Sequence, residues 1–103
     1  MSDGAKKGPT IVKLSNPLEH DGKTISEISL DLESLTGADI EVCVREAGAA
    51  GGQVIVAYEI DTEVHAQIAS RLSGLGRDVF RKMHARDYRK VMSPIRAFFL
   101  DSD

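Results

Sequence analysis

Cys43 and the three histidines are the residues of this chain that could bind a metal ion or act as a nucleophile. Such chemistry needs these side chains at short loop or helical spacings. His20, His65 and His84 are far apart in the sequence, and no two of them stand four residues apart. Cys43 lies on the apolar face of a predicted helix, where a thiol behaves as a small hydrophobic group. We therefore expect no metal, no cofactor and no catalytic residue, and a chain that is not an enzyme.

Two glycine-rich stretches could form phosphate-binding loops. Residues 74–79 (GLGRDV) follow a predicted helix and lack the third glycine of a dinucleotide-binding fingerprint, which follows a strand. Residues 48–52 (GAAGG) have no lysine after them. We interpret the first stretch as a helix end with a tight turn, in which Gly74 and Gly76 both stop the preceding helix. The second is interpreted as a flexible loop that ends a helix.

A run of basic side chains occupies residues 77–96 and consists of Arg77, Arg81, Lys82, Arg86, Arg89, Lys90 and Arg96. Two hypotheses account for it: a solvated helix surface, or a small nucleic-acid-binding regulatory domain that uses these helices. The formal net charge of −3 and the sequence pI of about 5.6 disfavour the second. Residues 1–60 alone carry 10 acidic and 5 basic side chains. We expect no nucleic-acid binding and keep that function as the alternative.

The first elements that position these residues are two strands. Residues 10–18 and 24–32 alternate apolar and polar side chains, which is the pattern of half-buried strands. The Asp21-Gly22 pair between them favours a hairpin turn. Pro17 cannot donate a backbone hydrogen bond, so we expect it at an edge or a bulge.

Three to four helices are predicted to follow the hairpin. Thr36 and Asp39 form a capping-box pattern before an apolar face of Ile40, Cys43, Val44 and Ala47. Asp61 or Thr62 is predicted to cap a second helix, a third spans 77–83, and a fourth begins at 85 or 86. Its apolar stripe contains Tyr88, Val91, Met92, Ile95, Phe98 and Phe99. Residues 54–60 fit either a strand or a buried extended loop, and Pro94 predicts a kink or a break in the last helix.

Length and composition bound this architecture. The 103 residues are 42% hydrophobic and 28% charged, enough for one small domain with a thin core. A single cysteine fits a reducing, cytoplasmic setting, and no apolar run is long enough to span a membrane. We expect an α+β fold in residues 10–100 behind a disordered lead-in at residues 1–9.

The end of the chain carries more apolar surface than one helix face can bury. Phe98, Phe99 and Leu100 are consecutive, and a helix separates adjacent side chains by about 100°. At least one of the three should therefore be exposed or covered by a partner. Together with Arg89 and Arg96 of the same helix, they are the candidate partner-binding residues.

Several short segments resemble a known family, the small tail assembly chaperones of long-tailed phages, which include the tail protein E and Mu-like chaperones. The opening hairpin resembles the family's in Leu14, Pro17, Leu18 and residues 20–23 (HDGK), and the second strand in Ile28 and Leu30. Residues 36–40 (TGADI), 68–75 (IASRLSGL) and the positions Asp87, Val91, Phe98 and Phe99 match its helices. The resemblance spans roughly residues 10–100, nearly the whole predicted domain.

This resemblance implies a non-enzymatic protein of phage or prophage origin that works in the host cytoplasm. Such chaperones bind the tape measure protein during tail assembly and are absent from the mature virion, and many are extended by a ribosomal frameshift. The tail tube protein and a second copy of the chain are further candidate partners. Pro94 and the glycine-rich 48–53 segment depart from the family pattern and could alter the docking surface.

Overall fold

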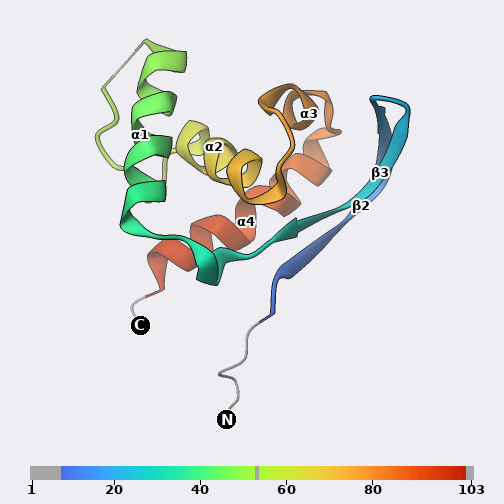
Figure 1. Ribbon diagram of the computed structural model, residues 1–103, viewed down its shortest axis with the longest axis horizontal. Coiled ribbons are helices and arrows are strands. Elements are labelled where there is room, and N and C mark those ends of the chain that lie inside the picture. Colours follow the sequence, from blue (N-terminus) through green and yellow to red (C-terminus); the bar gives the residue numbers. More distant parts are fainter. Residues whose placement is uncertain (1–7, 53, 102–103) are drawn as a thin grey trace.

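The computed structural model describes residues 8–52 and 54–101, in which an antiparallel hairpin of two strands is followed by four α-helices (Figure 1). This confirms the predicted α+β class with its order of elements. The Cα radius of gyration is 13.8 Å, close to the roughly 13 Å of a folded domain of this length. Most of the predicted lead-in lies outside the described residues.

The hairpin joins β2 (Thr10–His20) to β3 (Lys23–Leu30). Asp21 and Gly22 form its turn with φ values of 52° and 76°, which is the left-handed geometry that an Asp-Gly pair favours. Strand pairing is irregular between Lys13 and Leu18, the stretch that contains Pro17. The predicted turn and the predicted bulge at Pro17 are both confirmed.

The irregular stretch of β2 is held by a carboxylate from the last helix. The backbone N–H groups of Ser15 and Asn16 donate to the two carboxylate oxygens of Asp87 at 2.9 and 2.8 Å. Asp87 is fully buried, and Lys90 lies 3.5 Å from it. The hydrogen bond from Ser15 is the main reason that the pKa of Asp87 lies below its ordinary value, against the opposing effect of burial. Asp87 therefore replaces the strand partner that the bulge removes.

The second strand ends earlier than its alternation predicts. The expected strand reaches Leu32, but β3 ends at Leu30 and a 3-10 turn, η1, spans Leu32–Ser34. The backbone N–H and the hydroxyl of Ser34 both donate to the carbonyl of Asp31, and these bonds close the turn. Leu32 remains buried, so its apolar side chain reflects packing in the core rather than a position in the strand.

Helix α1 spans Gly37–Gly51 and begins at the predicted capping box. The Thr36 hydroxyl accepts a bond from the Asp39 N–H, while the Asp39 carboxylate accepts one from the Thr36 N–H at 2.9 Å. The prediction of a flexible loop at residues 48–52 was wrong, because the helix continues to Gly51 and ends at Gly52 with φ 68°. Alanines at 47, 49 and 50 favour the helix strongly enough to outweigh the glycines.

Residues 54–60 form an irregular connection with a turn at 58–60 rather than a strand. The segment is not a buried loop either, since Val54 is 86% exposed and Val56 is 93% exposed. Of its apolar side chains, those of Ile55 and Tyr58 pack against the core. Both predicted alternatives were wrong because apolar composition alone does not show whether a segment has a partner to cover it.

Helices α2 (Thr62–Ser73) and α3 (Arg77–Lys82) form the middle of the molecule. The Asp61 carboxylate caps α2 by accepting from the N–H groups of Glu63 and Val64, and Gly74 ends the helix at φ 77°. Gly76 was predicted to stop α2 but instead is the N-cap residue of α3. The predicted inward residues of α3 are all buried, namely Val79, Phe80 and Met83.

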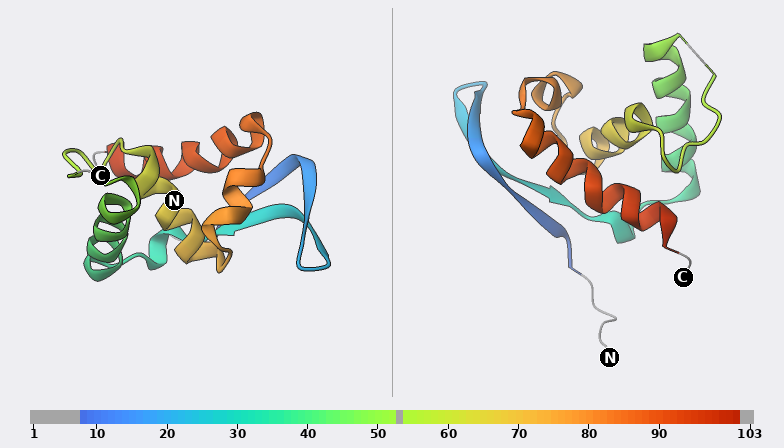
Figure 2. Two further views of the ribbon diagram at one scale, coloured as in Figure 1. Left: turned by 90° about the horizontal axis from the view of Figure 1, so that it is seen from above. Right: turned by 180° about the vertical axis from the view of Figure 1, so that it is seen from behind.

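Helix α4 spans Ala85–Leu100 and continues through Pro94 without a break. Of its predicted core residues, Val91, Met92 and Ile95 are buried. Tyr88 is half-buried, and burial raises the pKa of its hydroxyl. The helix lies along the back of the molecule, where it crosses α2 and contacts β2 (Figure 2).

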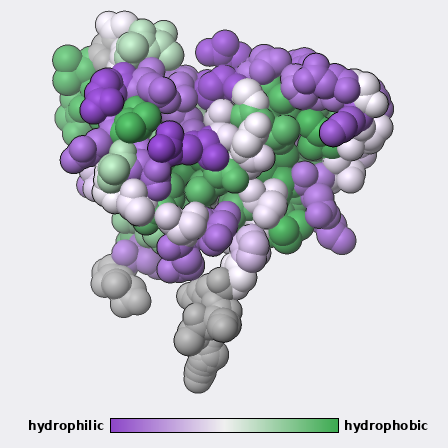
Figure 3. Space-filling view, in the orientation of Figure 1, coloured by the Kyte–Doolittle hydropathy of each residue, from purple (hydrophilic) through white to green (hydrophobic). Residues whose placement is uncertain are grey.

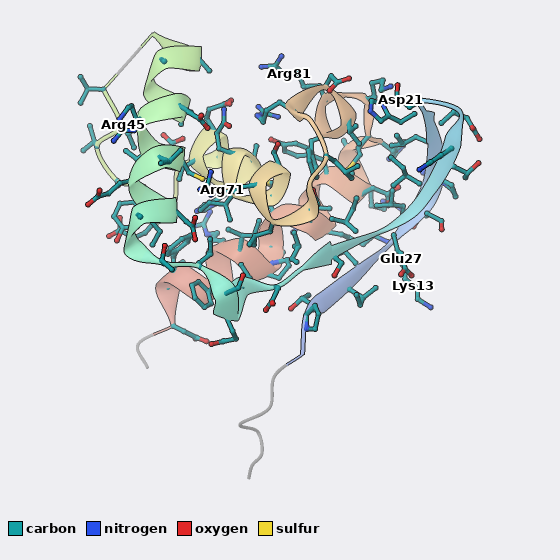
Figure 4. All side chains as sticks on the ribbon, viewed as in Figure 1. Lys13, Asp21, Glu27, Arg45, Arg71 and Arg81 are labelled. Carbon is teal, nitrogen blue, oxygen red and sulfur yellow. The ribbon has the colours of Figure 1, made fainter. Side chains whose placement is uncertain are left out.

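Ion pairs between elements help to fix this arrangement. Arg71, labelled in Figure 4, reaches from α2 to Asp39 at the start of α1, 2.8 Å away. Arg77 of α3 contacts Glu63 of α2 at 2.9 Å. On the strands, Lys13 and Glu27 are paired in register and point away from the helices (Figure 4). Hydrophobic surface appears at the edge of α1 and the segment after it, at the upper left of Figure 3.

Candidate functional site

The predicted partner-binding residues lie at the C-terminal half of α4. Leu100 is 53% exposed, whereas Phe98 and Phe99 are half-buried and pack against the core. This confirms that at least one of the three apolar residues remains exposed. Arg89 and Arg96 are exposed on the same helix. The five residues therefore share one helix but differ in how much surface they can offer.

Phe99 connects α4 to α2 and to the segment before α2. Its ring stacks on His65 with centroids 5.7 Å apart and an angle of 11°, and it meets Tyr58 edge-on at 5.6 Å. Phe98 contacts Phe99 edge-on at 5.5 Å. Aromatic pairs in such geometries add to the stability given by burial. Phe99 is thus a structural residue as well as a candidate for binding.

A pocket of about 350 Å³ lies between α4 and the N-terminal part of α2, and we call it the α2–α4 pocket. Arg89 and Arg96 both line it, two helical turns apart, with Ser93 between them. The remaining lining residues are Ile60, Thr62, His65 and Met92. The structure therefore brings the two predicted arginines into one concave site.

Phe98 does not join this pocket. It lines a second hollow together with Leu32, Pro94 and Asp101, next to the start of β2. Leu100 lines neither of the two hollows. The predicted residues thus divide into a basic pocket and an apolar helix end, with Phe99 packed beside both.

The positive charge of the α2–α4 pocket comes from its two arginines. Within residues 8–52 and 54–101, neither Arg89 nor Arg96 has a carboxylate within ion-pair distance. By contrast, Arg77 and Lys90 of the same basic run contact Glu63 and Asp87. Two guanidinium groups beside the hydroxyls of Thr62 and Ser93 can bind a carboxylate or another anion by charge-assisted hydrogen bonds.

The sequence suggested His65 only as a metal ligand and not as part of a binding pocket. His65 is only 2% exposed, and burial is the main reason that the pKa of its imidazole is lowered. Its Nε2 has no hydrogen-bond partner in the described part of the chain. The sequence shows a single histidine between Val64 and Ile68 of a predicted helix, and this pattern gives no sign of a pocket.

The basic run does not form one set of equivalent side chains. Arg81 and Lys82 lie at the end of α3, whereas Arg86, Arg89 and Arg96 follow one face of α4. Arg81 points outward from α3 in Figure 4. A nucleic-acid interface would therefore depend mainly on the three arginines of α4.

The described residues give little support for metal binding, for a reactive cysteine or for a membrane-spanning helix. No group of three or more His, Cys, Asp or Glu side chains that could hold a metal ion occurs in 8–52 and 54–101. Cys43 is buried, and this burial raises the pKa of its thiol, which disfavours the reactive thiolate. Among the helices described, none is both long enough and apolar enough to cross a membrane.

The comparisons with known proteins bear on this site and on the resemblance noted in the sequence. No curated protein and no solved structure gives a significant match to the chain. One family model, described as phage tail assembly chaperone proteins, E, or 41 or 14, matches residues 11–100. This range includes the hairpin except Thr10, all four helices and the residues of the α2–α4 pocket. The chain therefore belongs to the family of phage tail assembly chaperone proteins.

Proposed function

We propose that this chaperone binds the tape measure protein during tail assembly in the host cytoplasm and is absent from the finished virion. Family membership supports a non-enzymatic role with tail-related protein partners. The finer statement is supported by the surface beside α4. There, exposed apolar side chains adjoin a basic pocket, as expected for a protein-binding surface with a charged rim.

Exposure of apolar side chains on two neighbouring elements is the observation that carries this proposal. Ile60 is 51% exposed at the mouth of the α2–α4 pocket, and Leu100 is 53% exposed at the end of α4. The contact between Tyr58 and Phe99 holds the two elements together. A long helical protein with apolar stripes needs such cover before the tail tube assembles around it.

Co-expression tests the proposal. The tagged chain is expressed with the tape measure protein of the same genome and, separately, with its tail tube protein. We expect the tape measure protein to co-purify and to remain soluble only when the chain is present. Mass spectrometry of purified tails should detect the tape measure protein but not the chain. Failure to co-purify, or stoichiometric presence of the chain in tails, would contradict the proposal.

Self-association is tested on the purified chain alone. Exposed apolar residues at Val54, Val56 and Leu100 could also pack against a second copy. Sedimentation over a range of concentrations measures whether a dimer forms. A dimer that dissociates when the tape measure protein is added would indicate that both partners use the same surface.

A further inference from the structure

We infer that the α2–α4 pocket binds the carboxylate of an acidic side chain on the partner protein, with an apolar residue of the same partner segment packed against Ile60. The inference rests on the proposed function, because it describes how the partner is recognised. The site on this chain is the α2–α4 pocket, and the group on the partner is a carboxylate.

The arrangement of charge supports a carboxylate as the occupant. Arg89 and Arg96 stand seven residues apart, so their Cα atoms are about 10 Å apart along the helix axis. Ser93 lies between them on the same face, and Thr62 contributes a second hydroxyl from α2. Guanidinium groups bind planar carboxylates with two parallel hydrogen bonds, which lysines cannot do. The pocket therefore offers donors on two sides and no acidic side chain among its lining residues.

The apolar parts of the pocket strengthen this binding. Met92 and His65 are almost completely buried beneath it, and Ile60 stands at its edge. A charge-assisted hydrogen bond is stronger where apolar groups exclude water. His65 also brings a buried Nε2 that has no hydrogen-bond partner in residues 8–52 and 54–101, an exception to the general rule for buried polar atoms.

A protein segment fits the surroundings better than a nucleic acid does. The chain has a formal net charge of −3, and its first 60 residues carry twice as many acidic as basic side chains. This charge repels a long polyanion but has little effect on one carboxylate at close range. Exposed Ile60 favours an apolar contact at the edge of the pocket, whereas a phosphate backbone would leave it uncovered. We therefore assign the pocket to an acidic side chain of a protein.

Charge reversal in the pocket is the central test. The double variant Arg89→Glu/Arg96→Glu is compared with Arg81→Glu/Lys82→Glu, which makes the same change in net charge at exposed positions on α3, outside the pocket. Affinity for the tape measure protein is measured by biolayer interferometry on nuclease-treated samples. We expect the pocket variant to bind roughly tenfold more weakly or worse, and the matched variant to stay within about threefold of the wild type.

A neutral variant of the pocket guards against misfolding, and charge changes in the partner identify its acidic residue. Thermal melts check that each variant folds, and Arg89→Gln/Arg96→Gln replaces the charge reversal if the latter unfolds. Single Asp→Lys and Glu→Lys changes across the captured segment of the partner are then tested against Arg89→Glu/Arg96→Glu. Restored binding by one of these changes would place that carboxylate in the pocket.

The outcomes separate this inference from the proposed function. If the wild type does not bind the tape measure protein, the proposed function fails. If the wild type binds and the pocket variant binds equally well, the function stands and the inference is wrong. An equal loss in both double variants would show only general electrostatic attraction and would also contradict it. Binding that disappears after nuclease treatment would assign the arginines to a nucleic acid instead.

Discussion

Two buried polar side chains have opposite environments in this protein. The carboxylate of Asp87 accepts two backbone hydrogen bonds from the irregular stretch of β2 and lies near Lys90. The Nε2 of His65 has no partner in the described residues. Buried polar groups normally form hydrogen bonds, so the bonds to Asp87 stabilise the fold. The Nε2 atom of His65 can still form a hydrogen bond with another group. We expect Asp87 to matter for stability and His65 to matter for its pH dependence.

Replacing Asp87 with asparagine should lower the thermal midpoint by several degrees at neutral pH. The amide nitrogen would place a donor against one of the two backbone N–H groups that now share the carboxylate. Asp78→Asn is the matched control, because it also removes an acid from the first turn of a helix but lies exposed on α3. Circular dichroism melts of both variants measure the difference.

Acid should remove the stabilising effect of Asp87. Its pKa is lower in the folded protein than its ordinary value, mainly through the hydrogen bond from Ser15, so the ionised form stabilises the fold. This contribution is complete above the ordinary pKa of about 4 and is lost as the pH falls through the lower folded value. Below about pH 4, the wild type should therefore lose stability faster than Asp87→Asn. Parallel curves for the two proteins would contradict this account.

His65 should make the fold less stable in mild acid. Its folded pKa lies below the ordinary value of 6.5 because of burial, with Arg96 acting in the same direction and Asp61 in the opposite one. The unfolded chain takes up a proton more readily, so stability is full above about pH 6.5 and declines as the pH falls below it. His65→Phe keeps a ring against Phe99 and should flatten the melting temperature between about pH 7.5 and 5.5. An unchanged slope in this variant would count against the prediction.

At the scale of elements, local signals were enough to predict most boundaries. The Asp21-Gly22 turn, the capping box of α1 and the Asp61 cap of α2 depend on residues within four positions of each other, so the sequence contains them directly. Two features instead depend on which distant segments come into contact. Val54 and Val56 remain exposed, and Asp87 pairs with residues more than 70 positions away. Local patterns cannot show these contacts, because tertiary packing decides them.

Glycine substitutions at two element ends should have effects of opposite sign. Gly22→Ala should lower the free energy of unfolding by about 1 kcal/mol, because φ at this position is +76° and penalises a Cβ atom. Gly51→Ala should raise it by roughly 0.5 kcal/mol, since the residue is helical and a Cβ there meets no atom within 4 Å. Urea denaturation of both variants measures the change. A stabilised Gly22→Ala variant would mean that the hairpin turn relaxes to another geometry.

At the scale of the whole molecule, the sequence predicted which helix carries the candidate site but not the pocket that this helix forms with α2. Arg89 and Arg96 were selected as members of a basic run on the last predicted helix. Their pocket also needs Ile60, Thr62 and His65, which the chain brings to α4 from a different element. A surface built by two elements is a property of the packing, and no motif in either element reports it.

The end of α4 should separate binding from stability. Leu100→Ser should change the free energy of unfolding by less than about 0.5 kcal/mol, because the side chain is largely exposed, yet reduce affinity for the tape measure protein by roughly fivefold. Phe99→Ser should lower stability by about 2 kcal/mol as well as affinity, since its ring packs on His65 and Tyr58. Ile11→Ser, on the exposed hairpin, is the control that should leave binding intact. If Leu100→Ser binds as well as Ile11→Ser, the partner does not contact the helix end, and recognition rests on the pocket alone.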